Sequence, residues 1–213
     1  MIGRPPIPPM RLALAALALL AAGCADAPTP AEPVSEPAAE ILPSKPDRAV
    51  AQVAEVDGSG VSGTVEFVDL GDAVEVRYNL SGLGPGPHGF HVHQTGDCGP
   101  DSTGTPAGAA GGHLNPLSSP HGAPSATPAQ RHAGDLGNVE ADASGHALGV
   151  RVDSVLAFTG PTSFLGKAML VHGGEDDLAS QPSGDAGARV GCGVIRRADE
   201  AAADTLAVDS LAR

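Results

Sequence analysis

The chain has 213 residues, enough for one domain of ordinary size with tails, and 41% of them are hydrophobic. Aromatic residues make up only 2% and tryptophan is absent, so a core must rely on aliphatic side chains. The net charge of −13 argues against nucleic acid as a partner, because phosphate binding needs clustered lysine and arginine.

The N-terminus has the features of an export signal. An apolar run at residues 12–22 follows Arg11 and is too short to span a bilayer. It leads into Ala-Ala-Gly-Cys24, which resembles the processing site of bacterial lipoproteins, where the cysteine is lipidated. We therefore expect residues 1–24 to be a signal peptide that leaves Cys24 as a lipid anchor in the bacterial cell envelope, facing the periplasm. Simple cleavage after Ala27 is the alternative.

Composition divides the rest of the chain into three parts. Residues 25–48 are rich in alanine, proline and glutamate and show little periodicity, which predicts a disordered tether. The folded domain is expected at residues 49–196, where apolar residues recur regularly. Residues 197–213 form a C-terminal tail to which we assign no function.

Short segments of alternating apolar and polar residues, separated by glycine-rich turns, predict an all-β domain. The predicted strands, in chain order, are residues 50–56, 61–70, 73–80, 89–92, 137–141, 150–158, 168–172 and 190–195. Short strands at this spacing are typical of an antiparallel sandwich or barrel. Residues 94–134 show no strand pattern, and loops of that length in a compact domain are usually functional.

Seven side chains suited to metal binding occur along the domain. They are His91, His93, His113, His121, His132, Asp135 and His172. His91 and His93 lie two apart on a predicted strand, so both imidazoles face one side and can reach one metal ion. Three loop imidazoles with one carboxylate suit zinc, and four imidazoles without thiolate suit copper. The two sets need eight ligands from seven residues, so one residue must bind both ions, and His113 is the natural candidate.

In these regions the chain resembles the copper/zinc superoxide dismutases. The matching segments, which occur in the family's order, are His88–His93, Gly112–Leu117, Arg131–Val139, Leu170–His172, Asp176–Leu178 and Ala186–Ile195. The resemblance covers about residues 49–195 and implies an eight-stranded antiparallel Greek-key β-barrel with long metal-binding loops. It also implies an enzyme that converts superoxide to dioxygen and hydrogen peroxide with copper and zinc as cofactors. A homodimer is left open.

The resemblance implies a metal for each candidate ligand. The copper ligands would be His91, His93, His113 and His172. The zinc ligands would be His113, His121, His132 and Asp135. His113 would therefore bridge the two ions and, when copper is reduced, carry a proton to the substrate.

The resemblance also implies roles for residues that bind no metal. Asp176 would orient one ligand of each ion, and Arg189 would dock the superoxide anion beside copper. Cys98 would form a disulfide with Cys192, which agrees with three cysteines of which Cys24 carries lipid. The segment before Arg189 is short and lacks the lysines that help to attract the substrate in eukaryotic relatives.

Other readings of the same residues remain. A copper-buffering module on the same barrel would need the ligands but not Arg189, and a purely structural surface domain would need neither. We expect His88 to hydrogen-bond the backbone near the His91 strand, and His146 to lie solvated in a turn.

Overall fold

The computed structural model describes residues 47–201. The predicted signal peptide with Cys24, nearly all of the predicted tether, and the chain from residue 202 lie outside the described residues. Within residues 47–201, no helix has the length and apolar character needed to cross a membrane.

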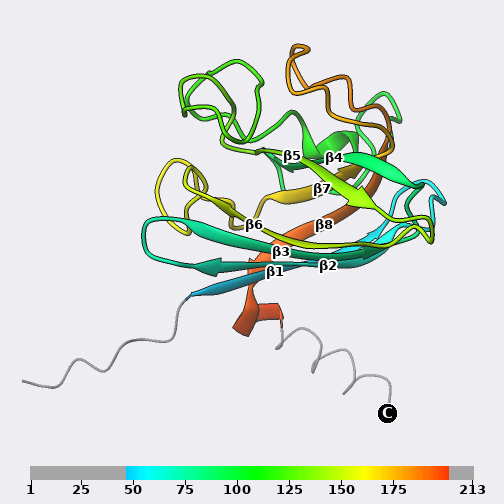
Figure 1. The fold of residues 1–213 in the computed structure, drawn as a ribbon, viewed down its shortest axis with the longest axis horizontal. Coiled ribbons are helices and arrows are strands. Elements are labelled where there is room, and N and C mark those ends of the chain that lie inside the picture. The colour runs from blue at the N-terminus through cyan, green and yellow to red at the C-terminus, as the bar shows by residue number, and fades with distance from the viewer. Residues whose placement is uncertain (1–46, 202–213) are drawn as a thin grey trace, which may run out of the picture. The chain divides into compact units, whose positions relative to one another are not determined.

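The described chain is an antiparallel β-structure with one short 3₁₀ helix, and helical residues follow the last strand at 198–201. The elements are β1 (Arg48–Glu55), β2 (Ser62–Asp69), β3 (Val74–Ser81), β4 (Gly86–His93), η1 (Gly108–Ala110), β5 (Asp135–Ala141), β6 (Ala147–Asp153), β7 (Ala168–His172) and β8 (Arg189–Arg197). The sheet order is β5-β4-β7-β8-β1-β2-β3-β6, and β5 also contacts β6, so the sheet nearly closes into a barrel (Figure 1). The connections β3–β4 and β6–β7 join strands that are not neighbours, as in a Greek key. The predicted eight-stranded antiparallel barrel is confirmed.

The core follows from the alternation in the sequence. On β3, Val74, Val76 and Leu80 are buried, whereas Arg77 between them is exposed. Burying each such side chain contributes about 1.5–3 kcal/mol. The few aromatic rings pack inside the barrel. The ring centroids of Phe67 and Phe164 lie 4.6 Å apart, and those of Phe158 and Phe164 lie 4.8 Å apart.

One predicted strand is misplaced. Residues 150–158 were expected to form a strand, but β6 runs from Ala147 to Asp153. The Asp153 carboxylate accepts hydrogen bonds from the backbone N–H groups of Val155 and Leu156, each at 2.8 Å, and this turn ends the strand. Leu156 is nevertheless buried in the core, which explains the apolar pattern. The other seven predicted strands overlap the observed ones.

Two long segments cover the same side of the barrel. The β4–β5 loop and the β7–β8 segment both lie over the β4, β5 and β7 strands (Figure 1). Val92 on β4 holds both arms of the first loop, because its N–H donates to Gly134 and its carbonyl accepts from Leu114, at 3.0 and 2.8 Å. A Cβ atom on Gly134 would lie 2.1 Å from the Val92 oxygen, so only glycine permits this approach.

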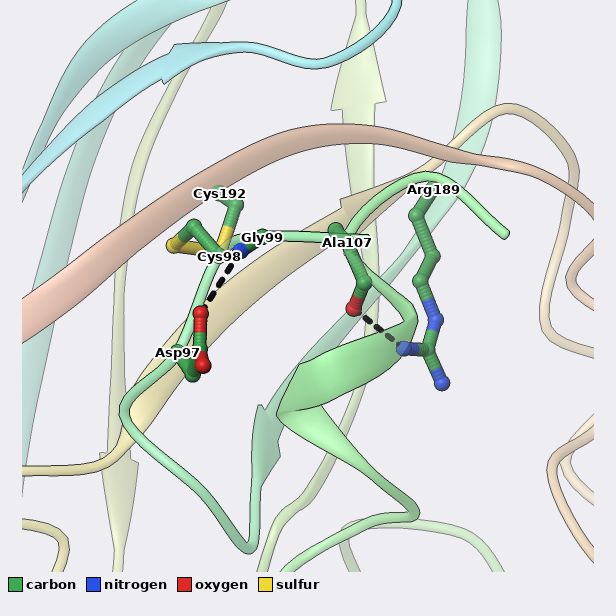
Figure 2. Close-up of a disulfide and its surroundings, with 6 residues drawn as sticks. All are labelled: Asp97, Cys98, Gly99, Ala107, Arg189 and Cys192. Carbon is green, nitrogen blue, oxygen red and sulfur yellow. Dashed lines mark hydrogen bonds between the residues drawn. A yellow bond between two sulfur atoms is a disulfide. The ribbon is translucent and has the colours of Figure 1, made fainter. Parts of the chain in front are cut away.

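A disulfide ties the β4–β5 loop to β8. Cys98 is bonded to Cys192 across 94 positions in the sequence, which confirms the predicted pairing. Figure 2 shows the bond, with Arg189 from the same strand reaching the loop again at Ala107. The loop is therefore fastened to β8 at two places.

Removing the disulfide should destabilise the metal-free protein. For a closed span of 94 positions the chain-entropy model gives about 4–5 kcal/mol. We expect the double variant Cys98→Ser/Cys192→Ser to lose stability of this order in denaturant unfolding, relative to the oxidised parent. Equal unfolding midpoints would show that the loop is held without the disulfide.

Candidate metal centre

Four imidazoles converge where β4 and β7 end. β4 carries His91 and His93, β7 ends at His172, and the β4–β5 loop brings His113 beside them. All four residues are buried, and their ligand atoms lie within 4.8 Å of one another. His93 and His113 form an isolated antiparallel β-bridge, so the loop runs in register with the strand at this point.

In this first group each imidazole has one ring nitrogen that donates no hydrogen bond to a carbonyl or carboxylate and could bind a metal. His93 and His172 each donate from Nδ1 to a backbone carbonyl oxygen, at 2.9 and 3.2 Å, and their Nε2 atoms lie 3.4 Å apart. His91 Nδ1 and His113 Nε2 are buried and have no hydrogen-bond partner. Unpartnered buried nitrogens are costly, and a bound cation would satisfy them. Four imidazoles without thiolate fit copper.

The second group surrounds Asp135, the first residue of β5. One carboxylate oxygen, Oδ1, lies 2.7 Å from His113 Nδ1, 3.0 Å from His132 Nδ1 and 3.1 Å from His121 Nδ1. The other oxygen accepts hydrogen bonds from the backbone N–H groups of His132 and Gly122. His121 Nδ1 is buried and makes no hydrogen bond despite its proximity to the carboxylate. Three imidazoles and one carboxylate fit tetrahedral zinc.

His113 belongs to both groups. Its Nδ1 faces the Asp135 carboxylate, and its Nε2 is one of the unpartnered nitrogens of the first group. The His113 ring centroid lies 4.0 Å from that of His91 and 5.4 Å from that of His121. The structure thus brings all seven predicted ligands together in two adjoining groups that share this residue.

A cavity of about 540 Å³ opens onto the first group. Its lining includes His93, His113, His172, His132, Pro182, Ser183 and Arg189. Arg189 begins β8 and donates from its two terminal nitrogens to the carbonyls of Ala107 and Gly111, at 2.5 and 2.6 Å (the first is drawn in Figure 2). These bonds fix the guanidinium at the wall of the cavity.

Sequence comparison agrees with this geometry. Residues 61–195 match the family model described as copper/zinc superoxide dismutase. The chain belongs to the copper/zinc superoxide dismutase family. Copper and zinc are its metals, and the dismutation of superoxide is its reaction.

Individual relatives of this family cover most of the described domain. The extracellular superoxide dismutase [Cu-Zn] of Haemonchus contortus is 42% identical, over 62% of this chain and 72% of the relative. The superoxide dismutase [Cu-Zn] of Yarrowia lipolytica is 44% identical, over 64% of this chain and 90% of the relative. The crystal structure of the clock protein EA4 is similar with a TM-score of 0.62 and 35% identity, covering 72% of this chain and 96% of that one.

Asp176 links the two groups from behind. Its Oδ2 accepts from His91 Nε2 and its Oδ1 from His121 Nε2, each at 2.8 Å, and the carboxylate is fully buried. Each ring is thereby turned so that its Nδ1 faces the metal-binding side. One carboxylate therefore orients one residue of each group.

Two supporting residues were not recognised in the sequence. The Asn138 side chain pairs with the backbone of Asp176, accepting from its N–H and donating to its carbonyl, both at 2.8 Å. Arg131 is buried, forms an ion pair with Asp153 and donates to the carbonyl of Asp135 at 3.0 Å. Both residues belong to a segment that matches the family. Their partners Asp153 and Asp176 lie 22 and 38 positions further along the chain, and no local sequence pattern identifies them.

The two remaining histidines lie outside both groups, as expected. The ring nitrogens of His88 lie 2.9 Å from the carbonyl oxygen of His172 and 2.8 Å from that of Gly84. His88 therefore supports the backbone beside the first group. His146 is exposed in a turn.

Burial and charge prepare these side chains for cations. Burial lowers the pKa of His113 to about 4 and that of His172 to about 3, so both imidazoles are neutral at neutral pH. Burial tends to raise the pKa of Asp176, but hydrogen bonds from His121 and His91 outweigh it and lower that pKa. Metals bind the neutral imidazole, which is the form of His113 and His172 at neutral pH, and the ionised Asp176 can accept the hydrogen bonds that orient His91 and His121. At His121 the neighbouring carboxylates outweigh burial and raise the pKa to about 9, so a cation bound there displaces a proton.

Proposed function

We propose that the two groups bind the two metals of this superoxide dismutase. Copper would be held by His91, His93, His113 and His172, and zinc by His113, His121, His132 and Asp135. The observation that carries this assignment is the pair of buried, unpartnered nitrogens in the first group, His91 Nδ1 and His113 Nε2. Bound copper supplies the one-electron chemistry: one superoxide is oxidised to dioxygen, and a second is reduced and takes up two protons to give hydrogen peroxide.

The chain's own residues bind the anion and supply a proton. The Arg189 guanidinium has five N–H donors, more than its two carbonyl bonds use, and it lines the cavity beside the first group. It can therefore dock an anion. We place the transferable proton at His113 Nε2. The other ring nitrogen, Nδ1, is held by the Asp135 carboxylate. Asp176 keeps the ring of His91 in place through both half-reactions.

A copper-buffering role would use the same ligands without an anion site. Arg189 at the wall of an open cavity favours catalysis, because a fixed positive charge beside the metal attracts an anion, whereas storage gains nothing from a charge that repels the metal. Superoxide is the small anion that this site suits.

Replacing His113 by Ala should uncouple the two groups. Copper would keep three imidazoles, and zinc two imidazoles with Asp135. We expect a shifted cupric absorption spectrum and a dismutation rate lower by about 100-fold, roughly 2.7 kcal/mol. The control is His146→Ala, which removes an exposed histidine in a turn. An unchanged spectrum and rate for His113→Ala would exclude the bridge.

Replacing Arg189 by Ile should slow dismutation about tenfold, or roughly 1.4 kcal/mol, with copper and zinc retained. Arg189→Lys should lose less, because it keeps the charge but not the planar fork. Arg77→Ile is the matched control, since it removes an exposed arginine from β3. If local attraction dominates, added salt should slow the parent more than Arg189→Ile. Equal rates for all four proteins would rule out both docking and attraction.

We also propose that the enzyme is exported and lipid-anchored in a bacterial cell envelope. The organisation would be a signal peptide at 1–24, a tether at 25–48, the enzyme domain at 49–196 and a tail at 197–213. Export is supported by the Cys98–Cys192 disulfide, which persists in oxidising compartments, and by the extracellular relative of Haemonchus contortus.

The N-terminal peptide of the protein recovered from bacterial membranes tests the anchor. Mass spectrometry should find diacylglycerol on Cys24, and Cys24→Ser should release the protein to the soluble fraction. A mature chain that begins at Pro28 would show simple secretion instead. Sedimentation of the same material over a range of concentrations distinguishes a monomer from the homodimer that we leave open.

A further inference from the structure

The β7–β8 segment binds the backbone of His121 through one glutamine. Gln181 Oε1 accepts from the His121 N–H at 2.8 Å, and Gln181 Nε2 donates to the His121 carbonyl at 2.9 Å. His121 lies in the β4–β5 loop, outside every strand. Within residues 47–201 we find no other hydrogen bond to either of these backbone groups. The Gln181 carboxamide thus makes the two backbone hydrogen bonds to His121 that a neighbouring strand would make in a sheet.

Gln181 is itself held by a compact turn. Its Nε2 also donates to the carbonyl of Ala179 at 3.0 Å, which fixes the orientation of the carboxamide. The Asp177 carboxylate accepts from the N–H groups of Ala179 and Ser180, at 2.9 and 2.7 Å. The segment closes on itself where the Gly184 N–H donates to the Ser180 carbonyl at 2.7 Å. Gln181 is therefore presented by a preformed loop, which reduces the entropy lost when it binds.

The same segment also holds the side chain of His121. The Asp176 carboxylate accepts from Nε2 at 2.8 Å, and Gly184 closes over that bond. A Cβ atom on Gly184, whose φ is +70°, would lie 1.8 Å from Asp176 Oδ1 and 2.7 Å from His121 Nε2. With both the backbone and the far ring nitrogen fixed, Nδ1 is directed at Asp135 Oδ1, 3.1 Å away.

We propose that Gln181 is a positioning residue for zinc, which acts by fixing the backbone of His121. The inference rests on the proposed function, in which His121 is a zinc ligand. Residues that orient metal ligands typically change metal affinity by 10- to 100-fold when they are replaced. Because Gln181 is exposed, we expect the low end of that range.

Zinc release tests the proposal. Protein loaded with Zn²⁺ alone is mixed with a chromophoric chelator, and the rate of transfer is measured. Gln181→Ala should release zinc about tenfold faster than the parent. Gln181→Glu should also release it faster, because the glutamate keeps the acceptor but faces the His121 carbonyl with a second oxygen. Gln52→Ala, which removes an exposed glutamine from β1, should match the parent.

The visible spectrum of Co²⁺ in place of zinc separates positioning from general destabilisation. A positioning role predicts that Gln181→Ala alters the cobalt bands while the melting temperature of the metal-free protein stays near that of Gln52→Ala. Unchanged release rates would overturn the proposal. So would faster release with an unaltered cobalt spectrum and a lower metal-free melting temperature. A parent that takes up no zinc would instead refute the proposed function, and the inference would fall with it.

Discussion

The metal centre depends on the backbone of Val92. Its N–H donates to Gly134 at the end of the β4–β5 loop, and its carbonyl accepts from Leu114 near the middle of that loop. Gly134 in turn donates to the Leu114 carbonyl at 2.9 Å, so strand and loop form one hydrogen-bonded unit. His113 precedes Leu114 and Asp135 follows Gly134, and both side chains are therefore delivered beside the histidines of β4. These three bonds, together with the His93–His113 bridge and the Cys98–Cys192 disulfide, return a loop of about forty residues to the barrel.

Collecting seven polar side chains in a buried place has an electrostatic cost that bound metals would offset. Burial favours neutral imidazoles, while the hydrogen bonds at Asp176 keep that carboxylate charged. Two cations placed among these residues would meet His113 and His172 already neutral, whereas His121 would have to give up a proton. The arrangement also explains why supporting residues are numerous. Asn138 holds Asp176, and Arg131 binds the carbonyl of Asp135, so both carboxylate residues are supported from outside the two groups.

The sequence allowed most of the fold and the membership of the two groups to be predicted, because both leave repeating or ordered signals. Alternation along β3 and the His-x-His pair on β4 are readable from neighbouring residues. The predicted end of β6 was wrong, because the strand stops where the Asp153 carboxylate accepts hydrogen bonds from two backbone N–H groups in a turn. Gln181 was not identified, because its partner His121 lies 60 positions earlier and its side chain meets only backbone atoms. Such contacts impose no pattern on the partner's side chain.

The charge of the β7–β8 segment fits a structural task better than substrate attraction. Between His172 and Arg189 it carries four acidic residues and no lysine or arginine. Two of those acids, Asp176 and Asp177, are occupied with hydrogen bonds that build the His121 contact. The chain as a whole bears a net charge of −13, which repels an anion at long range, although at physiological salt the Debye length is only about 8 Å. In the described lining of the cavity, Arg189 is the one arginine or lysine, and no carboxylate opposes it there. Attraction must therefore be local, and the segment that might have extended it outward holds His121 in place instead.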